Sequence, residues 1–204
     1  MSKLKVARKV RTRIPTDYGD FQLCYYTNTL DEKEHLALFT GEISKTKSVL
    51  VRVHSECFTG DVLGSRRCDC GEQLDQSLKI ISEAGAGILI YMRQEGRGIG
   101  LLEKLRAYNL QDDGLDTIDA NLELGHEADA RDYSLAALIL RDLGVESVEL
   151  ITNNPTKISA LEESGIDVTK RVSLEIPANP DNLSYLRTKA QRMNHLLEIK
   201  TLKN

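Results

Sequence analysis

The sequence predicts an α/β (α+β) fold, a single domain with a mixed β-sheet flanked by helices. Short alternating or apolar runs fill the first quarter of the chain, as β-strands do. From Gly71 onward helical and strand-like segments alternate, which is typical of βα units. The length of 204 residues fits one domain over 1–204. N-terminal strands followed by βα units are therefore expected.

The N-terminal strands are expected where apolar or alternating runs lie between turn residues such as Asp17, Gly19 and Lys45. They fall at 5–14, 20–27, 36–44 and 48–53. The run VLVRV at 49–53 is short, β-branched and apolar, which predicts an inner strand.

The rest of the chain alternates between two periodicities. Apolar runs predict buried strands at 87–92 and 147–151, and helical spacing predicts helices at 73–83, 99–111, 129–143 and 155–164. Asn154 suits the N-cap of the last of these helices and Pro155 its first turn. A terminal helix is expected at about 182–198, with one apolar face made by Leu183, Leu186, Ala190, Met193 and Leu197.

Charge and hydropathy exclude some classes of protein. The net charge of −4 and the acidic balance argue against a general nucleic-acid surface. No apolar run approaches the ~20 residues of a membrane span, and no apolar stretch follows the basic N-terminus as in a secretory signal. We expect a cytoplasmic protein with neither membrane nor nucleic acid as partner. Arginines beside glycine-rich segments favour a small anionic ligand.

The strongest local signal is the segment HSECFTGDVLGSRRCDCG at 54–71. Cys57, Cys68 and Cys70 have a spacing that lets three thiolates bind one Zn²⁺ and leave the fourth position to water, as in a catalytic site. A structural zinc closed by His54 or Cys24, or three buried thiols without metal, are the alternatives. Cys24 lies in an apparent strand, where a small core residue is the simpler interpretation.

Two strand–loop–helix segments suit an anionic ligand. GILIYMRQEGRGIG at 87–100 places Arg93 and Arg97 in a glycine loop, although Rossmann and Walker spacings are absent and the glycines could only shape a tight turn. ELITNNPTK at 149–157 places Thr152 at the carboxyl end of a strand, where α/β sheets bind ligands. Lys157 lies near a helix N-terminus, which is unfavourable for a cation unless an anion binds there.

Seven ordered motifs together resemble the GTP cyclohydrolase II family, from about residue 10 to 197. They are RVHSEC (52–57), TGD (59–61), RCDCG (67–71), RQEGRGIGL (93–101), DANLELG (119–125), ADARDY (128–133) and TNNPTK (152–157), and the tail NPDNLSYLRTKAQRMNHLL is also similar. Arg66, His126 and Asn194 depart from the family's usual residues, none at a functional position. A dihydroxybutanone-phosphate synthase domain, common upstream in this family, is expected to be absent.

The resemblance implies site residues at matching positions. Cys57, Cys68 and Cys70 become ligands of one catalytic Zn²⁺, and Tyr108, Asp129 and Arg131 become catalytic. The GTP contacts become Arg52, Val53, His54, Ser55, Glu56, Gln73, Glu95, Gly96, Arg97, Thr117, Thr152 and Lys157. Read without the family, Asp129 could be an N-cap, Arg131 a surface arginine and Tyr108 a core residue.

The implied reaction hydrolyses GTP in the first step of riboflavin biosynthesis. The imidazole ring opens at C8, with release of formate and pyrophosphate, to give 2,5-diamino-6-(5-phosphoribosylamino)pyrimidin-4(3H)-one. Mg²⁺ accompanies the triphosphate, and a homodimer is expected. The family model makes Arg131 a nucleophile assisted by Asp129, but a pKa above 12 favours a charge-stabilising role for this guanidinium. The competing hypotheses are a nucleotide-binding regulator without turnover and a zinc-stabilised nucleic-acid-binding protein.

Overall fold

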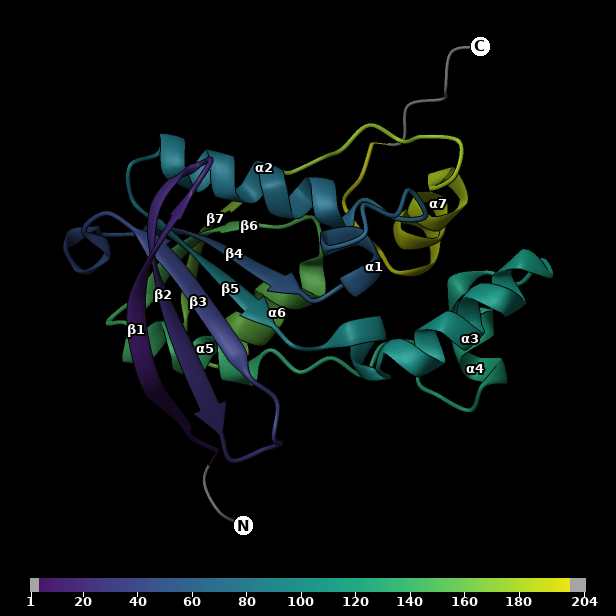
Figure 1. Cartoon of the computed structure of the whole chain (residues 1–204), viewed down its shortest axis with the longest axis horizontal. Helices are drawn as coiled ribbons and strands as arrows, with labels where there is room; N and C mark the ends of the chain where they lie inside the picture. Colours follow the sequence, from purple (N-terminus) through teal and green to yellow (C-terminus); the bar gives the residue numbers. More distant parts are fainter. Residues whose placement is uncertain (1–3, 199–204) are drawn as a thin grey trace. The chain divides into compact units, whose positions relative to one another are not determined.

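The computed structural model describes residues 4–198, and the chain within it forms two compact units (Figure 1). The sheet unit comprises the residues up to His54, Asp75–Arg93 and Asp132–Leu174. The helical unit comprises Ser55–Leu74, Gln94–Arg131 and the residues from Glu175 onward. The chain therefore passes between the two units several times.

The sheet unit contains a seven-stranded mixed sheet in the order β1-β2-β3-β5-β4-β6-β7. Its strands are β1 (Val6–Thr16), β2 (Gly19–Asn28), β3 (His35–Thr40), β4 (Val49–Ser55), β5 (Gly87–Met92), β6 (Ser147–Ile151) and β7 (Asp167–Val172). β1, β2, β3 and β5 pair antiparallel in that order. β4 and β6 pair parallel, as do β6 and β7. The carboxyl ends of these three strands therefore meet at one edge of the sheet.

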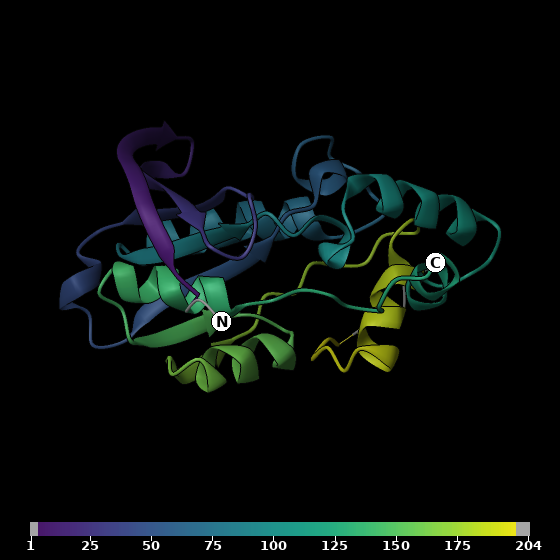
Figure 2. The same cartoon turned by 90° about the horizontal axis from the view of Figure 1, so that it is seen from below.

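Helices cover both faces of this sheet (Figures 1 and 2). α5 (Ser134–Asp142) and α6 (Pro155–Glu163) lie on one face, and the part of α2 (Cys70–Glu83) within the sheet unit lies on the other. The core under α5 takes alternate strand residues, as a period of two requires; these are Val49, Val51, Val53, Ile88, Ile90 and Met92. Ile81 of α2 approaches Gly87 so closely that a Cβ there would lie 3.1 Å from its side chain.

The helical unit is built from short helices and loops. After α1 (Phe58–Asp61) and the first turn of α2 come the 3₁₀ turn η2 (Glu95–Gly98), α3 (Leu101–Asp112), α4 (Thr117–Glu123) and α7 (Leu183–Arg192). α3 and α4 pack against each other, and Arg192 of α7 pairs with Asp116 and Asp119 at the start of α4. No helix within residues 4–198 is long and apolar enough to cross a lipid bilayer.

The predicted α/β class, mixed sheet and order of elements are confirmed. The strand expected at 36–44 ends at Thr40 and is followed by a 3₁₀ turn, η1 (Ile43–Lys45), and two expected helices differ in their bounds by five residues or more at one end. The helix expected at 129–143 begins only at Ser134, and its N-cap position is Tyr133, so Asp129 is not a cap. The terminal helix expected at about 182–198 ends at Arg192, because Asn194 adopts a left-handed φ of 53° and the His195 N–H bonds back to Lys189 O at 3.0 Å.

Other elements were not expected from the sequence. β7 is an edge strand with a largely exposed, polar sequence, DVTKRV, and therefore carries little apolar signal. α4 begins where Asp116 accepts hydrogen bonds from Ile118 N and Asp119 N, at 2.8 and 3.0 Å. Whether residues 1–204 act as one domain stays a prediction, because the contacts define two units.

Candidate metal centre and anion-binding residues

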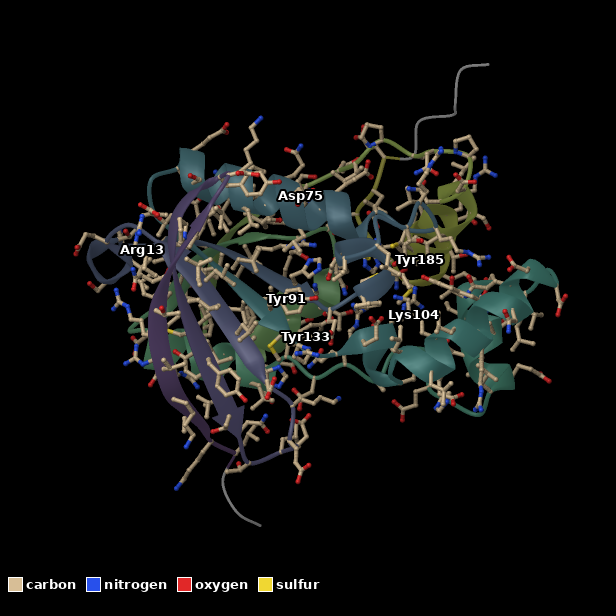
Figure 3. All side chains as sticks on the ribbon, viewed as in Figure 1. Arg13, Asp75, Tyr91, Lys104, Tyr133 and Tyr185 are labelled. Carbon is tan, nitrogen blue, oxygen red and sulfur yellow. The ribbon has the colours of Figure 1, made fainter. Side chains whose placement is uncertain are left out.

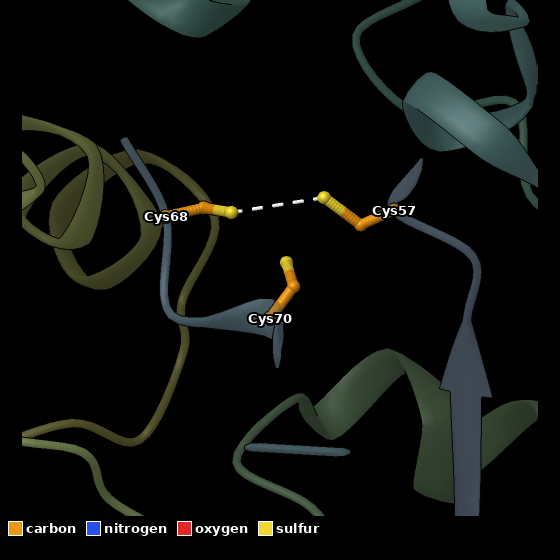
Figure 4. A group of neighbouring side chains, drawn as sticks. All are labelled: Cys57, Cys68 and Cys70. Carbon is orange, nitrogen blue, oxygen red and sulfur yellow. Dashed lines mark hydrogen bonds between the residues drawn. The ribbon is translucent and has the colours of Figure 1, made fainter. Parts of the chain in front are cut away.

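Three cysteines of the helical unit converge because the loop between them folds back on itself (Figure 4). Cys57 precedes α1, while Cys68 and Cys70 stand at the start of α2. Two glycines permit the close approach. A Cβ on Gly60 would lie 3.0 Å from Cys68 Sγ and 3.2 Å from Cys57 Sγ, and a Cβ on Gly71 would lie 2.3 Å from Gly60 O. The loop can close only where both positions lack side chains.

The geometry of the three sulfurs fits zinc. Their Sγ atoms all lie within 4.8 Å of one another, and Cys57 Sγ is 3.6 Å from Cys68 Sγ. Zn–S bonds of about 2.3 Å in a tetrahedron place two sulfurs about 3.8 Å apart. All four cysteines of the chain are free thiols, so no disulfide competes for these ligands. The cluster therefore has the donors and spacing that one Zn²⁺ requires.

The surroundings of Cys57 stabilise a negative charge on its sulfur. Hydrogen bonds from the Cys68 and Cys70 thiols, together with the Lys104 ammonium, hold the pKa of Cys57 far below its usual range despite burial. The bond that Cys68 makes to Cys57 raises the pKa of Cys68 to about 12. One thiolate is thus stabilised by two thiols and a lysine, and a metal cation would replace the shared protons.

His54 and Cys24, the alternative fourth ligands, have other surroundings in the sheet unit. Within residues 4–198, the group of potential metal ligands consists of Cys57, Cys68 and Cys70. Cys24 is fully buried in β2 as part of the sheet core, which confirms its interpretation as a core residue. The His54 ring stacks on Tyr91 of β5 at 5.4 Å between centroids (Figure 3 labels Tyr91). The group consists of three cysteine sulfurs, a donor set that zinc accepts.

Tyr108 of α3 lies beside the cysteines. Its Oη is 3.2 Å from Thr59 Oγ1, which in turn is 3.7 Å from Cys57 Sγ. The Arg67 guanidinium stacks on the Tyr108 ring at 4.6 Å. Burial raises the pKa of Tyr108, so its phenol is protonated at neutral pH. A protonated hydroxyl linked to the cluster through one threonine is placed to donate a proton there.

The η2 turn holds an arginine in a strained backbone conformation. Gly96 and Arg97 both have φ of 62°, a left-handed conformation that is rare for an arginine. Gly98 packs on the backbone of Ala130, since a Cβ there would lie 3.0 Å from Ala130 O, and Ala130 N bonds to Arg97 O at 3.0 Å. Both terminal nitrogens of Arg97 are buried without a hydrogen-bond partner. A buried guanidinium whose terminal nitrogens are not bonded by the protein is suited to bind an anion.

The Glu95 carboxylate, by contrast, is fully engaged by the protein. Oε1 accepts hydrogen bonds from Lys104 Nζ and Gly96 N, both at 2.8 Å, and Oε2 accepts one from Phe58 N at 2.5 Å. Its side chain is only 9% exposed. These bonds join the η2 loop to α1 and α3.

Asp129 and Arg131 form a two-bonded ion pair in the segment before α5. Asp129 Oδ1 accepts from Arg131 Nε at 2.7 Å, and Oδ2 accepts from Nη2 at 2.5 Å. Burial opposes ionisation of Asp129, but the Arg131 hydrogen bonds and charge, with a smaller contribution from Arg97, lower its pKa overall. Arg131 is therefore held in place rather than solvated at the surface, as the side chain is 11% exposed.

Three polar residues of the sheet unit gather at the carboxyl ends of β4 and β6. Arg52 Nη1 donates to Ile151 O at 3.0 Å, and Lys157 Nζ donates to Val53 O at 2.7 Å. Thr152, at the end of β6, is also buried. This is the edge where α/β sheets bind ligands.

The predicted capping of α6 is confirmed, since Asn154 accepts from Thr156 N at 2.9 Å and Pro155 occupies the first turn. Lys157 is less isolated than its position near the helix start suggests. Besides its bond to a carbonyl, its Nζ lies 5.5 Å from the centroid of the Tyr133 ring (Figure 3 labels Tyr133). These contacts stabilise the ammonium, so the lysine alone does not require an anion.

The other residues implied by the resemblance are placed less specifically. Ser55 ends β4 and Glu56 follows it, both half-buried, and Thr117 is the first residue of α4. Gln73 is buried on α2 and donates through Nε2 to Asp69 at 2.6 Å. His54 and Val53 are buried at the end of β4.

Two lysines that the sequence did not single out support the cysteine loop. Lys104 Nζ lies 3.1 Å from Cys57 Sγ, and Lys189 Nζ bonds both Asp69 oxygens, at 2.9 and 3.3 Å. Asp69 stands between two of the cysteines and is 1% exposed. The aspartate between Cys68 and Cys70 was the one sequence signal for such a lysine, because a carboxylate buried in this segment needs a cation nearby.

The cluster of three cysteines lies beside a glycine-rich loop that carries Arg97. This arrangement is typical of a protein that binds a metal ion through thiolates and an anion through arginine. The family model described as GTP cyclohydrolase II matches residues 7–173. The chain belongs to the GTP cyclohydrolase II family.

Its relatives are consistent with this assignment. The riboflavin biosynthesis proteins RibBA of Bacillus mycoides (strain KBAB4) and Bacillus cereus (strain B4264) are each 56% identical over 194 residues, which cover 95% of this chain and 49% of theirs. The chain thus spans about half the length of the curated relatives it matches. A solved structure of RibBX, a two-domain 3,4-dihydroxy-2-butanone 4-phosphate synthase from A. baumannii, is 24% identical with a TM-score of 0.46, covering 84% of this chain and 40% of that one. That likeness is too distant to inform the site.

Proposed function

We propose that this chain catalyses the GTP cyclohydrolase II reaction. GTP is hydrolysed at C8 of its imidazole ring, formate and pyrophosphate are released, and 2,5-diamino-6-(5-phosphoribosylamino)pyrimidin-4(3H)-one is formed as the first step of riboflavin biosynthesis. The observation that carries the proposal is the cluster of Cys57, Cys68 and Cys70, which has zinc-compatible spacing and lies inside the region matched by the family.

The cysteines hold the metal in this proposal. Bound to them, Zn²⁺ would act as a Lewis acid and make water a nucleophile at neutral pH. Tyr108 donates or relays a proton near the opened ring, because its phenol is protonated and linked through Thr59 to the cluster. Gly60 keeps the base of the cluster free of side chains.

The phosphate chemistry is assigned to cationic groups. Arg97 has an unsatisfied buried guanidinium and is assigned to a phosphate. Arg131, fixed by Asp129, stabilises charge that develops as pyrophosphate leaves. Arg52, Thr152 and Lys157 are also assigned to the triphosphate from the family positions, with Mg²⁺ bound to the triphosphate.

Recognition of guanine is assigned to Glu56 and Gln73. Gln73 is supported by Asp69, which fixes the orientation of its amide. Val53, His54, Ser55, Gly96 and Thr117 follow as further contacts from the family positions, and a contact at Glu95 would use its backbone, because its carboxylate oxygens already accept bonds from the protein. A homodimer is part of the proposal.

Release of formate tests the enzyme. Zinc-loaded protein incubated with GTP and Mg²⁺ should release formate and pyrophosphate and form a pyrimidine product. Formate is the decisive measurement, because simple nucleotidases release only phosphates. Binding of GTP without formate would favour a nucleotide-binding regulator and contradict the proposal.

A further inference from the structure

Lys104 of α3 occupies a fixed position beside one sulfur of the cysteine cluster (Figure 3 labels Lys104). Its Nζ is 3.1 Å from Cys57 Sγ and 2.8 Å from Glu95 Oε1, and its side chain is 11% exposed. The ammonium is therefore largely removed from solvent and lies between the Cys57 sulfur and the Glu95 carboxylate. Its distance of 5.7 Å from the Tyr108 ring centroid adds a weaker cation–π contact.

Backbone groups fix the partner of this lysine in turn. Glu95 accepts hydrogen bonds from Phe58 N, directly after Cys57, and from Gly96 N. The Glu95 carboxylate of η2 is thus tied to the backbone beside Cys57 while it also accepts a hydrogen bond from Lys104. A chain of backbone amide, carboxylate, ammonium and thiolate leaves the ammonium little freedom to move away from Cys57.

The positive charge of Lys104 can change the properties of a metal ion bound to the cysteines. Three thiolates outweigh the charge of one Zn²⁺ and donate electrons strongly, which weakens the metal as a Lewis acid. Hydrogen bonds to a metal ligand from neighbouring groups tune that ligand's donation. An ammonium that is hydrogen-bonded to one sulfur withdraws electron density from that sulfur. It also offsets the excess negative charge of the three thiolates.

We infer that Lys104 is a positioning residue that tunes the metal centre by weakening the electron donation of Cys57, with Glu95 holding it in place. This inference rests on the proposed zinc site. It gives Glu95 a role in organising the metal centre that is separate from any contact with GTP.

Substitution of Co²⁺ for Zn²⁺ allows the electron donation of the cysteine sulfurs to be measured by absorption spectroscopy. Co²⁺ substituted for Zn²⁺ gives thiolate-to-metal charge-transfer bands, whose energy falls when the sulfur becomes a better donor. The Lys104→Met and Lys104→Gln variants should shift these bands to lower energy, whereas Lys104→Arg should keep them near the parent's position. Arg106→Met is the matched control, because Arg106 lies on the same helix, is exposed and pairs with Glu103.

Zinc-loaded Lys104→Met and Lys104→Gln should also release formate about 10- to 100-fold more slowly, the range for loss of a group supporting a metal ligand. A purely structural lysine would leave the cobalt bands unmoved once metal is bound. Unshifted bands in a folded, metal-loaded Lys104→Gln protein would overturn the inference. A parent protein that binds Co²⁺ without thiolate bands would overturn the zinc site itself, and that result is read on the parent alone.

Discussion

The carboxylate of Asp129 accepts two parallel hydrogen bonds from the guanidinium of Arg131, at 2.7 Å from Nε and 2.5 Å from Nη2. A fork-to-fork pair of this kind fixes the plane of the arginine as well as its charge. Arg131 N also bonds Asp129 Oδ1 at 3.2 Å, so the carboxylate organises the local backbone too. The pair is consistent with an arginine positioned to stabilise charge.

Arg131→Lys should therefore lower turnover by about 100-fold, the cost expected when a catalytic group is misplaced by about 1 Å. The positive charge is retained, but a lysine cannot reproduce the planar fork. Steady-state formate release measures the effect, with Arg106→Lys as an exposed control on α3. Unchanged turnover in Arg131→Lys would show that a point charge suffices.

Gly60→Ala should prevent normal metal binding. The added methyl would lie 3.0 to 3.2 Å from Cys68 Sγ, Cys70 Cβ and Cys57 Sγ, so the sulfurs must separate. Gly64→Ala is the control, because nothing lies within 4 Å of its Cβ position and its left-handed φ of 62° costs only about 1–2 kcal/mol. Zinc per chain, measured on purified protein, should fall for Gly60→Ala and stay at the parent's value for Gly64→Ala. Equal zinc in both would contradict the packing described around the cluster.

Lys189→Met should destabilise the protein by about 3–5 kcal/mol, because it leaves the buried Asp69 carboxylate without its cation. Chemical denaturation measures the loss, and Arg187→Met on the exposed face of the same helix should have little effect. Adding Asp69→Asn to Lys189→Met should cost less than the sum of the two single changes. Additive losses would mean that the two side chains do not stabilise each other.

Acid should destabilise the sheet unit through His35. Burial, aided by Lys33 and Arg93 and opposed by Asp31, lowers its pKa, and its Nδ1 accepts a hydrogen bond from Arg93 N at 3.1 Å. The unfolded chain, with a histidine pKa of about 6.5, takes up the proton first as pH falls. Stability is therefore lost below about pH 6.5, by up to about 1.4 kcal/mol per pH unit, until the folded histidine also titrates.

His35→Gln keeps an acceptor for Arg93 N but cannot be protonated. Denaturation of parent and variant at pH 7 and at pH 5.5 isolates the contribution of this residue, since the other histidines are common to both proteins. The variant should lose less stability on acidification. The same loss in both proteins would remove His35 as the cause.

Residue spacing was enough to predict the cysteine cluster and the inner strands. C-x10-C-x-C with three nearby glycines indicates a cysteine cluster, although it left catalytic zinc, structural zinc and buried thiols open, and β4 and β5 are apolar on alternate or successive positions. Tertiary contacts decided the rest. Asp129 lies before the helix that was expected to begin there and pairs with Arg131, and the polar edge strand β7 is defined by its partner β6.

The two supporting lysines were also beyond reach of the sequence pattern. Lys104 and Lys189 look like ordinary charged residues on amphipathic helices. Only the packing of α3 and α7 brings them to Cys57 and Asp69. A residue that acts by contacting another functional residue does not belong to a recognisable sequence motif.

The proposed reaction requires that three thiolates hold the metal that opens the guanine ring, and two cysteine variants can be compared to test this requirement. Zinc content and formate release from GTP are measured on the same samples of parent, Cys68→Ser and Cys24→Ala, with a melting curve for each to confirm folding. Cys24 is a matched control, being a buried free thiol in the core of the sheet unit. The Cys68→Ser protein should lose zinc and formate release while still binding GTP, and Cys24→Ala should keep both. A folded Cys68→Ser protein that releases formate at the parent's rate would contradict the account.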